Sequence, residues 1–311
     1  MYAIVFPGQG SQRPGMGQDL HTEYETARLV FEEVSDATGV DTIGLCFHTD
    51  ETTLRRTDCA QLALFTCGMA AWRCLEEASG LEPAAFAGHS VGEYAAVCSA
   101  GAIGLADCAR LVKQRGQVMA AAGKEVPGTM AAVLGMEAEP LQALCNSVAD
   151  SGVCVIANDN APGQLVVSGN VDAVHALSAV APDKGAKRVI PLSVSGAFHS
   201  PLMAGPGREF AVALAEAEFG GTMRAPVFAN TTAESVTDPS AWPDLLARQL
   251  ESAVLWTGSV RAMAAAGVTH WIECGVGEVL CGLVRRIVPE AQVSKVVDSA
   301  TLDSVVEEVA A

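Results

Sequence analysis

The sequence contains few basic residues: 19 lysines and arginines stand against 36 aspartates and glutamates in 311 residues. A formal net charge of −17 argues against a general binder of phosphate backbones, so we expect no nucleic-acid partner. An acidic protein partner would have to meet a local basic patch. Charged residues make up only 18% of the chain and hydrophobic residues 50%, a globular composition that supplies a substantial core.

Other absences narrow the class of protein further. No uncharged apolar run approaches the ~18 residues of a membrane-spanning helix, and the strand-like start at 1–6 leaves no secretion signal, so we expect a cytoplasmic protein without a membrane partner. None of the ten cysteines forms C-x-x-C, which favours buried thiols in a reducing compartment. Cys46 and His48 lack a second ligand pair, so we expect no metal site.

Alternating apolar patterns predict a large α/β domain at 1–125 and 194–311. Its expected strands are 1–6, 84–87, 226–230, 269–273 and 291–297. Its expected helices are about 22–38, 60–79, 91–100, 104–122, 241–250, 256–266 and 279–287. In the first helix we expect four residues to face inward: Leu29, Val30, Phe31 and Val34.

A different pattern fills residues 126–193. Strands at 129–135, 153–157, 164–168 and 186–191, with helices at 138–151 and 171–181, give the order β-α-β-β-α-β. We therefore predict a small ferredoxin-like domain inserted into the larger, α/β-hydrolase-like one.

A G-x-S-x-G motif marks the most informative point of the chain, Gly88-His89-Ser90-Val91-Gly92. It follows the apolar run 84–87 and precedes a helical pattern, as in a nucleophile elbow that lifts a serine out of a strand-to-helix turn. The pattern is short enough to occur in an ordinary glycine-rich turn, so it acquires meaning only with a base nearby.

A serine nucleophile needs such a base, and His199 is the best candidate among six histidines. It lies in the loop 193–201, where the chain re-enters the large domain after the small one, although a capping or solvated histidine would also fit a loop. His89 sits inside the elbow, so its side chain should point away from Ser90 and play a structural part.

Five motifs in the same order carry a family resemblance: 6–12, 88–94, 114–116, 162–164 and 196–200. Together they resemble malonyl-CoA:acyl carrier protein transacylases and the related acyltransferases of polyketide synthases. The resemblance runs from residue 6 to about 284, and that family has the same inserted ferredoxin-like unit.

The resemblance implies a role for each matching residue. Ser90 would be the acylated nucleophile, His199 the general base and later acid, and the Gln249 carbonyl the group that orients His199. Backbone N–H groups of Gln9 and Val91 would form the oxyanion hole, the latter at a helix N-terminus.

The same resemblance assigns the substrate side. Arg115 would clamp the free carboxylate of malonate, although an isolated helical arginine is usually a surface residue. Phe198 before His199 resembles malonyl-selective members, because its ring would crowd a branched acyl group. Gln61 and Asn160 match positions near the substrate and the phosphopantetheine arm. Leu62 and Val276 depart from the family, which often has proline at both places.

These assignments predict transfer of malonyl from malonyl-CoA to an acyl carrier protein, for fatty acid or polyketide synthesis, without a metal or redox cofactor. Five basic residues are candidates for docking the carrier: Lys184, Lys187, Arg188, Arg285 and Arg286. An editing acyl hydrolase, a transferase of other acyl groups between carriers and a non-catalytic docking protein are the alternatives.

Overall fold

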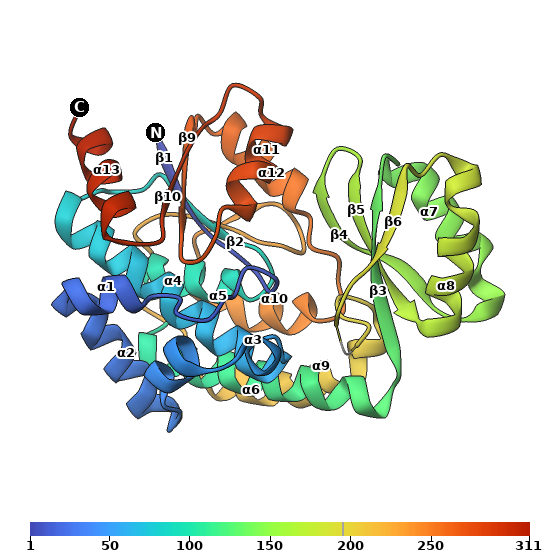
Figure 1. Ribbon diagram of the computed structural model, residues 1–311, viewed down its shortest axis with the longest axis horizontal. Helices are drawn as coiled ribbons and strands as arrows, with labels where there is room; N and C mark the ends of the chain where they lie inside the picture. The colour runs from blue at the N-terminus through green and yellow to red at the C-terminus, as the bar shows by residue number, and fades with distance from the viewer. Residues whose placement is uncertain (195) are drawn as a thin grey trace.

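The computed structural model describes residues 1–194 and 196–311; Ser195, in the predicted base-bearing loop, lies outside them. A six-stranded sheet forms the centre of the larger part, in the order β10-β9-β1-β2-β7-β8 (Figure 1). Its neighbouring strands are parallel except for β7 and β8. The strands are β1 (Tyr2–Phe6), β2 (Ala85–Gly88), β7 (Val227–Phe228), β8 (Ser235–Val236), β9 (His270–Cys274) and β10 (Gln292–Val296).

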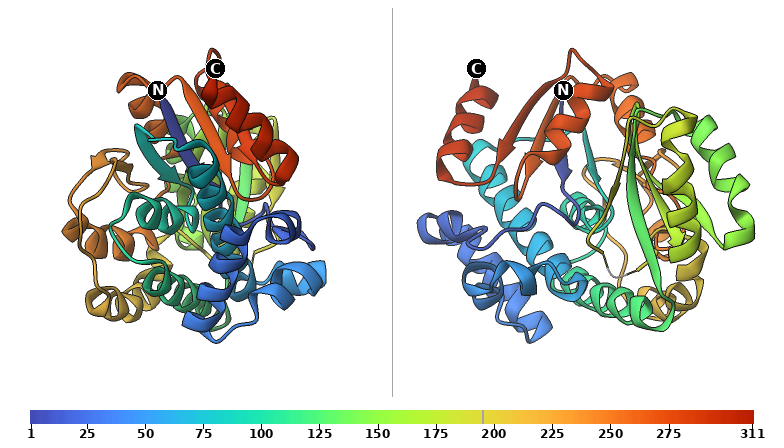
Figure 2. Two further views of the ribbon diagram at one scale, coloured as in Figure 1. Left: turned by 90° about the vertical axis from the view of Figure 1, so that its left-hand side faces the viewer. Right: turned by 45° about the vertical axis from the view of Figure 1, so that its right-hand side comes forward.

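Helices cover both faces of this sheet (Figure 2). A parallel sheet covered in this way needs apolar side chains on both faces of each strand, which the run from Ala3 to Phe6 supplies, with every residue at most 1% exposed. The helices are α1 (Gln18–Glu23), α2 (Glu25–Thr38), α3 (Glu51–Leu54), α4 (Thr57–Ser79), α5 (Gly92–Ala100), α6 (Leu105–Glu125), α9 (Ala204–Glu216), α10 (Trp242–Gln249), α11 (Trp256–Ala265), α12 (Val279–Ile287) and α13 (Ser299–Ala310).

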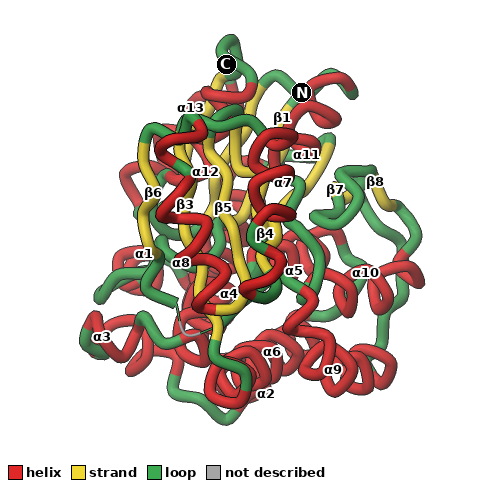
Figure 3. The backbone as a smooth tube through the Cα atoms, turned by 90° about the vertical axis from the view of Figure 1, so that its right-hand side faces the viewer, coloured by secondary structure: helices red, strands yellow, loops and turns green. Residues whose placement is uncertain are grey.

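The inserted unit is a four-stranded antiparallel sheet in the order β4-β5-β3-β6. Helices α7 and α8 cover its outer face (Figure 3). Its elements are β3 (Gly128–Leu134), α7 (Ala138–Ser147), β4 (Cys154–Ala161), β5 (Gln164–Asn170), α8 (Val171–Val180) and β6 (Arg188–Pro191). The predicted ferredoxin-like order is confirmed, and the α/β fold class with it; the domain limits at 125/126 and 193/194 stay a prediction.

Strand β4 fastens the small sheet to the large part. Val254 donates its N–H to the Ala157 carbonyl at 2.9 Å and accepts from the Asp159 N–H at 2.9 Å. The Thr257 hydroxyl donates to the Asp159 carboxylate at 2.6 Å. This attachment places the inner face of the small sheet opposite the elbow.

Some element predictions were wrong. Leu29 is 56% exposed, whereas Val30, Phe31 and Val34 are buried. The helix predicted at about 22–38 is α2, which begins at Glu25; Tyr24 is extended and separates it from α1, which was not predicted. Helix α9 was missed since its first turns contain glycine and proline, and α13 was missed despite a capping box between Asp298 and Thr301.

The cysteines pack as small apolar residues. All ten are free thiols, and nine are buried, Cys59 being partly exposed. Within the described ranges, no helix is long and apolar enough to cross a bilayer, and no cluster of histidine, cysteine or carboxylate side chains could hold a metal ion.

Candidate active site

The elbow is built as the motif predicts. Strand β2 ends at Gly88, α5 starts at Gly92, and Ser90 between them has a positive φ of 53°. A Cβ on Gly88 would lie 2.0 Å from the Gly92 carbonyl carbon, and one on Gly92 would lie 2.1 Å from the Phe6 oxygen. The close backbone contacts therefore require glycine at both 88 and 92. Between them, the positive φ of Ser90 costs about 1 kcal/mol or more.

Asn230, two residues after β7, holds this turn. Its Oδ1 accepts from the Ser90 N–H at 2.8 Å, and its Nδ2 donates to the Gly88 carbonyl at 2.7 Å. Asn230 was not predicted as a site residue, although an asparagine at the end of the expected strand 226–230 was an available signal.

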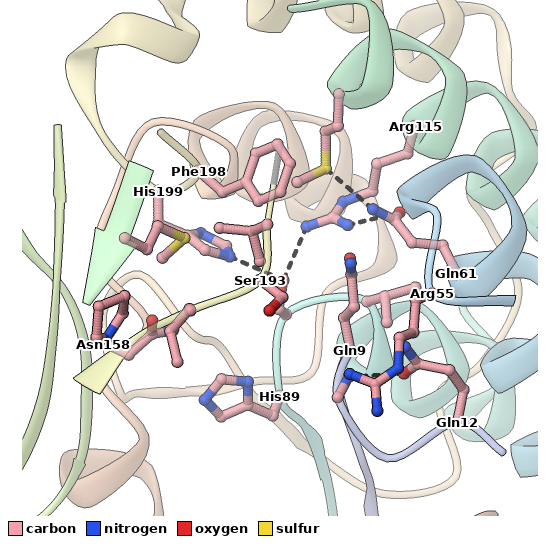
Figure 4. Close-up of a pocket in the computed structure, with 18 residues that line it drawn as sticks. Gln9, Gln12, Arg55, Gln61, His89, Arg115, Asn158, Ser193, Phe198 and His199 are labelled. Atoms are coloured by element: carbon pink, nitrogen blue, oxygen red, sulfur yellow. Dashed lines mark hydrogen bonds between the residues drawn. The ribbon is translucent and has the colours of Figure 1, made fainter. Parts of the chain in front are cut away.

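The His199 imidazole points into the cavity (Figure 4). Its Nε2 lies 2.8 Å from the Ser90 Oγ. Its Nδ1 lies 2.8 Å from the Gln249 carbonyl and 3.2 Å from the Ser252 carbonyl. Both carbonyls can only accept, so Nδ1 carries the proton and Nε2 is left free to accept the serine proton. The predicted Gln249 carbonyl thus lies in place, and Ser252 is an addition.

Burial, and next the nearby Arg115 charge, lower the pKa of His199 to about 3. The imidazole is therefore neutral near pH 7 and available as a base. Like Ser90, His199 has a positive φ, 56°, and its N–H donates to the Leu250 carbonyl at 3.0 Å. Backbone geometry on both sides fixes the reacting pair.

Arg115 of helix α6 is fully buried, with 0% exposure. Its Nη1 donates to the Gln61 Oε1 at 2.7 Å, and its Nη2 donates to the Gln249 Oε1 at 2.8 Å and to the Ser90 Oγ at 3.0 Å. Its guanidinium also stands 5.4 Å from the centre of the Tyr94 ring. Among the described residues, no carboxylate pairs with this cation.

Glu93, also missed, lies beneath the elbow on α5 and is 1% exposed. It accepts from the Asn230 N–H at 2.6 Å and from the Gln249 Nε2 at 2.5 Å. Burial raises the pKa of Glu93 to about 7, against the effect of these hydrogen bonds and of Arg115.

The predicted oxyanion donors lie next to Ser90. The loop at 8–9 presses on the elbow so closely that a Cβ on Gly8 would be 2.7 Å from the His89 carbonyl oxygen. Gln9 and Val91 both line the cavity, and Val91 immediately precedes α5. Neither N–H donates to a described backbone or side-chain acceptor, so both can receive an oxyanion.

The cavity in front of Ser90 has a volume of about 290 Å³. Its walls include four predicted residues besides the oxyanion donors and Ser90: Gln61, Arg115, Phe198 and His199. Asn158 lines the cavity, whereas Asn160 lies behind it with its Oδ1 2.8 Å from the His89 Nε2. His89 thus turns to Asn160 rather than to the Ser90 hydroxyl. Leu62 and Val276 are buried away from the cavity lining.

The basic residues proposed for docking are all exposed. The Arg286 Nε donates to the Pro162 carbonyl at 3.0 Å, in the turn between β4 and β5. A Cβ on the adjacent Gly163 would lie 3.5 Å from the Arg286 guanidinium, and one on Gly135 would lie 2.6 Å from the Lys187 side chain. Arg286 therefore also ties α12 to the small sheet.

Comparison with known proteins gives a consistent result. The family described as the acyl transferase domain matches residues 3–302. A malonyl CoA-acyl carrier protein transacylase of Escherichia coli K12 is 39% identical over 306 residues, which cover 98% of this chain and 99% of the relative.

Comparison with solved structures identifies the same kind of protein. A malonyl-CoA:acyl carrier protein transacylase from Xanthomonas oryzae pv. oryzae is 38% identical with a TM-score of 0.95, covering 99% of this chain and 98% of that one. A malonyl-transacylase in complex with a type II polyketide synthase acyl carrier protein is 37% identical with a TM-score of 0.94, covering 99% of both chains.

Proposed function

Because the chain belongs to the acyl transferase domain family, we propose that it transfers a malonyl group from malonyl-CoA to the phosphopantetheine thiol of an acyl carrier protein. One observation carries the choice of cargo: the buried Arg115 guanidinium lies 3.0 Å from the Ser90 Oγ and has no carboxylate partner among the described residues. A carboxylate on the acyl group would pair with it.

In the first half-reaction, the Ser90 oxygen attacks the thioester carbonyl while the His199 Nε2 takes the serine proton. The N–H groups of Gln9 and Val91 stabilise the oxyanion of the tetrahedral intermediate. When that intermediate collapses, the bond to sulfur breaks, the CoA thiolate leaves, and His199 returns the proton to it. Malonyl stays on Ser90 as an ester.

The second half-reaction runs the same steps backwards with a new thiol. His199 takes the proton of the phosphopantetheine thiol, the sulfur attacks the malonyl ester, and Ser90 leaves with the proton from His199. Throughout, Arg115 holds the malonyl carboxylate, with Gln61 and Gln249 supporting the guanidinium. Phe198 closes the cavity beside His199 and would exclude a branch on the acyl group.

The reaction as written needs no metal or redox cofactor, since proton transfer and charge stabilisation account for each step. The five exposed basic residues form the docking face for an acidic carrier. The free thiols fit a cytoplasmic location. Reversing the charges of Lys187 and Arg285 should raise the KM for carrier protein while leaving the KM for malonyl-CoA unchanged. An unchanged KM for carrier would refute this docking face.

Intact-mass analysis tests the proposal directly. The protein is mixed with malonyl-, methylmalonyl- or acetyl-CoA, and then with holo acyl carrier protein. We expect malonyl to load onto Ser90 and to appear on the carrier. Rapid release of free malonate instead of transfer would indicate an editing hydrolase, preferential loading of acetyl would refute the Arg115 clamp, and no loading at all would indicate a docking protein.

A further inference from the structure

Glu93 lies outside the cavity lining but is connected to Ser90 and Arg115 through one side chain. The Gln249 amide donates from Nε2 to the Glu93 carboxylate at 2.5 Å and to the Ser90 carbonyl at 2.9 Å, and it accepts at Oε1 from Arg115 at 2.8 Å. Glu93 itself receives the Asn230 N–H at its other oxygen. Glu93, Gln249, Arg115 and Asn230 are all buried.

A glutamine amide can lie in two orientations related by exchange of its oxygen and nitrogen. Here only one orientation satisfies the neighbours. The carboxylate of Glu93 and the Ser90 carbonyl both accept, so they need the NH₂ group, and the Arg115 Nη2 donates, so it needs the oxygen. Both Glu93 oxygens accept from N–H groups in this structure, one from Asn230 and one from Gln249, which fixes the amide.

The separation of charges follows from this arrangement. Arg115 is held by the neutral amide oxygens of Gln61 and Gln249, and the carboxyl group of Glu93 is one amide further away. A carboxylate placed directly on the guanidinium would occupy the N–H groups that an acyl carboxylate needs. With the Gln249 amide between them, Glu93 orients the site without occupying those N–H groups.

We propose that Glu93 is a positioning residue for malonyl selectivity, which acts on Arg115 by fixing the orientation of the Gln249 amide. This inference rests on the proposed clamping of malonate by Arg115. A residue that merely supports the elbow would affect the transfer of all acyl groups alike, whereas Glu93 should affect the preference for malonyl.

The test is the ratio of kcat/KM for malonyl-CoA to that for acetyl-CoA. In Glu93→Gln, one amide hydrogen-bond donor must face either the Asn230 N–H or the Gln249 NH₂, and a rotated Gln249 turns a donor toward Arg115. We expect the ratio to fall about tenfold or more, mainly through KM for malonyl-CoA. Glu93→Asp keeps an accepting carboxylate and should retain most of the wild-type ratio.

A matched control is Glu273→Gln in β9, because Glu273 is also fully buried and accepts the Cys281 N–H at 2.8 Å but lies outside the cavity lining. Its ratio should equal that of wild type. The rate of Ser90 modification by phenylmethylsulfonyl fluoride, which needs the nucleophile but no carboxylate clamp, should be unchanged in Glu93→Gln.

If Glu93→Gln does not fold, Gln249→Met removes the same amide while keeping its backbone carbonyl, and it should lower kcat/KM more for malonyl-CoA than for acetyl-CoA. Equal losses for malonyl-CoA and acetyl-CoA in the variant that folds would overturn the role of Glu93. A wild-type protein without preference for malonyl-CoA would instead refute the proposed clamp itself, so the two failures are distinguishable.

Discussion

The two halves of the site are held in different ways. The nucleophile half, which comprises Ser90, His199, Gln9 and Val91, is fixed by backbone: two positive φ angles, glycines pressed against carbonyls, and carbonyls behind the imidazole. The clamp half, which comprises Arg115, Gln61 and the Gln249 amide, is fixed by side chains. The difference indicates that the proposed nucleophile and base are positioned by the fold itself, whereas the proposed selection of the acyl group depends on side chains that a substitution can change.

Removing the nucleophile should produce the largest effect. Ser90→Ala should lower malonyl transfer by about 10⁴-fold or more, because no other group can form the acyl enzyme. Intact-mass analysis after mixing with malonyl-CoA should detect no adduct. Ser193→Ala, a change at another serine of the cavity lining, should load normally. An adduct on Ser90→Ala would place the acyl group on a different residue.

A methyl group at the elbow tests how strictly the backbone fixes the nucleophile half. Gly92→Ala puts a Cβ 2.1 Å from the Phe6 carbonyl oxygen, so helix α5 and strand β1 must move apart. We expect a loss of about 3 kcal/mol in the free energy of unfolding, measured by urea denaturation. Gly104→Ala, where a Cβ meets nothing within 4 Å, should be neutral. Equal stability of both variants would contradict the tight crossing.

Truncating the clamp should change selectivity rather than chemistry. Arg115→Ala should lower kcat/KM for malonyl-CoA by about 100-fold, since a buried carboxylate loses its charged partner. For acetyl-CoA the change should be small, which steady-state kinetics with both thioesters would measure. The control is Arg110→Ala on the same helix, where Arg110 is exposed and pairs with Asp107. Parallel losses for both substrates would remove Arg115 from the clamp.

The smallest expected effect is on the pH dependence of the free energy of unfolding, and it has opposite signs for His199 and for Glu93. His199 has a lowered pKa of about 3 against 6.5, so the unfolded chain binds the extra proton and stability is lost as pH falls through this window. Glu93 has a raised pKa of about 7 against 4.5, so the folded chain binds the extra proton and stability is lost as pH rises.

Between pH 4.5 and 6.5, the stability of His199→Gln relative to wild type should therefore increase toward low pH, and that of Glu93→Gln toward high pH, each on the order of 1 kcal/mol. Urea midpoints at three pH values in that window would measure both trends. Trends of the same sign would contradict the assigned protonation states.

The same division explains how far the sequence could be interpreted. The elbow and the loop of His199 were predictable because backbone segments that cross closely leave glycines in the sequence. Arg115 lies within one of the five ordered motifs, and the family resemblance implied Gln249 from a segment outside them. The hydrogen bonds of Arg115 with the Gln61 and Gln249 amides were not predictable, since they join residues 54 and 134 positions apart without any periodicity. Glu93 read simply as part of a helix.

Strand β4 shows a second limit. Register shifts between Ile156 and Asn158, and between Asp159 and Ala161, interrupt its pairing with β5. Such bulges change the direction of side chains, so alternation along the strand does not tell which amide faces the cavity. Here Asn158 lines the cavity and Asn160 binds His89. Substrate contact by Asn160 stays a prediction.

The carbonyls of Gln249 and Ser252 behind His199 have one more consequence. An uncharged support does little to retain a proton on the imidazole, which suits a reaction that exchanges one thiol for another of the same kind. Two thioesters of such thiols have nearly equal free energies, so neither direction is favoured by the chemistry. The protein would then act as an equilibrator, with the net flow of acyl groups set by the relative supply of loaded and empty carriers.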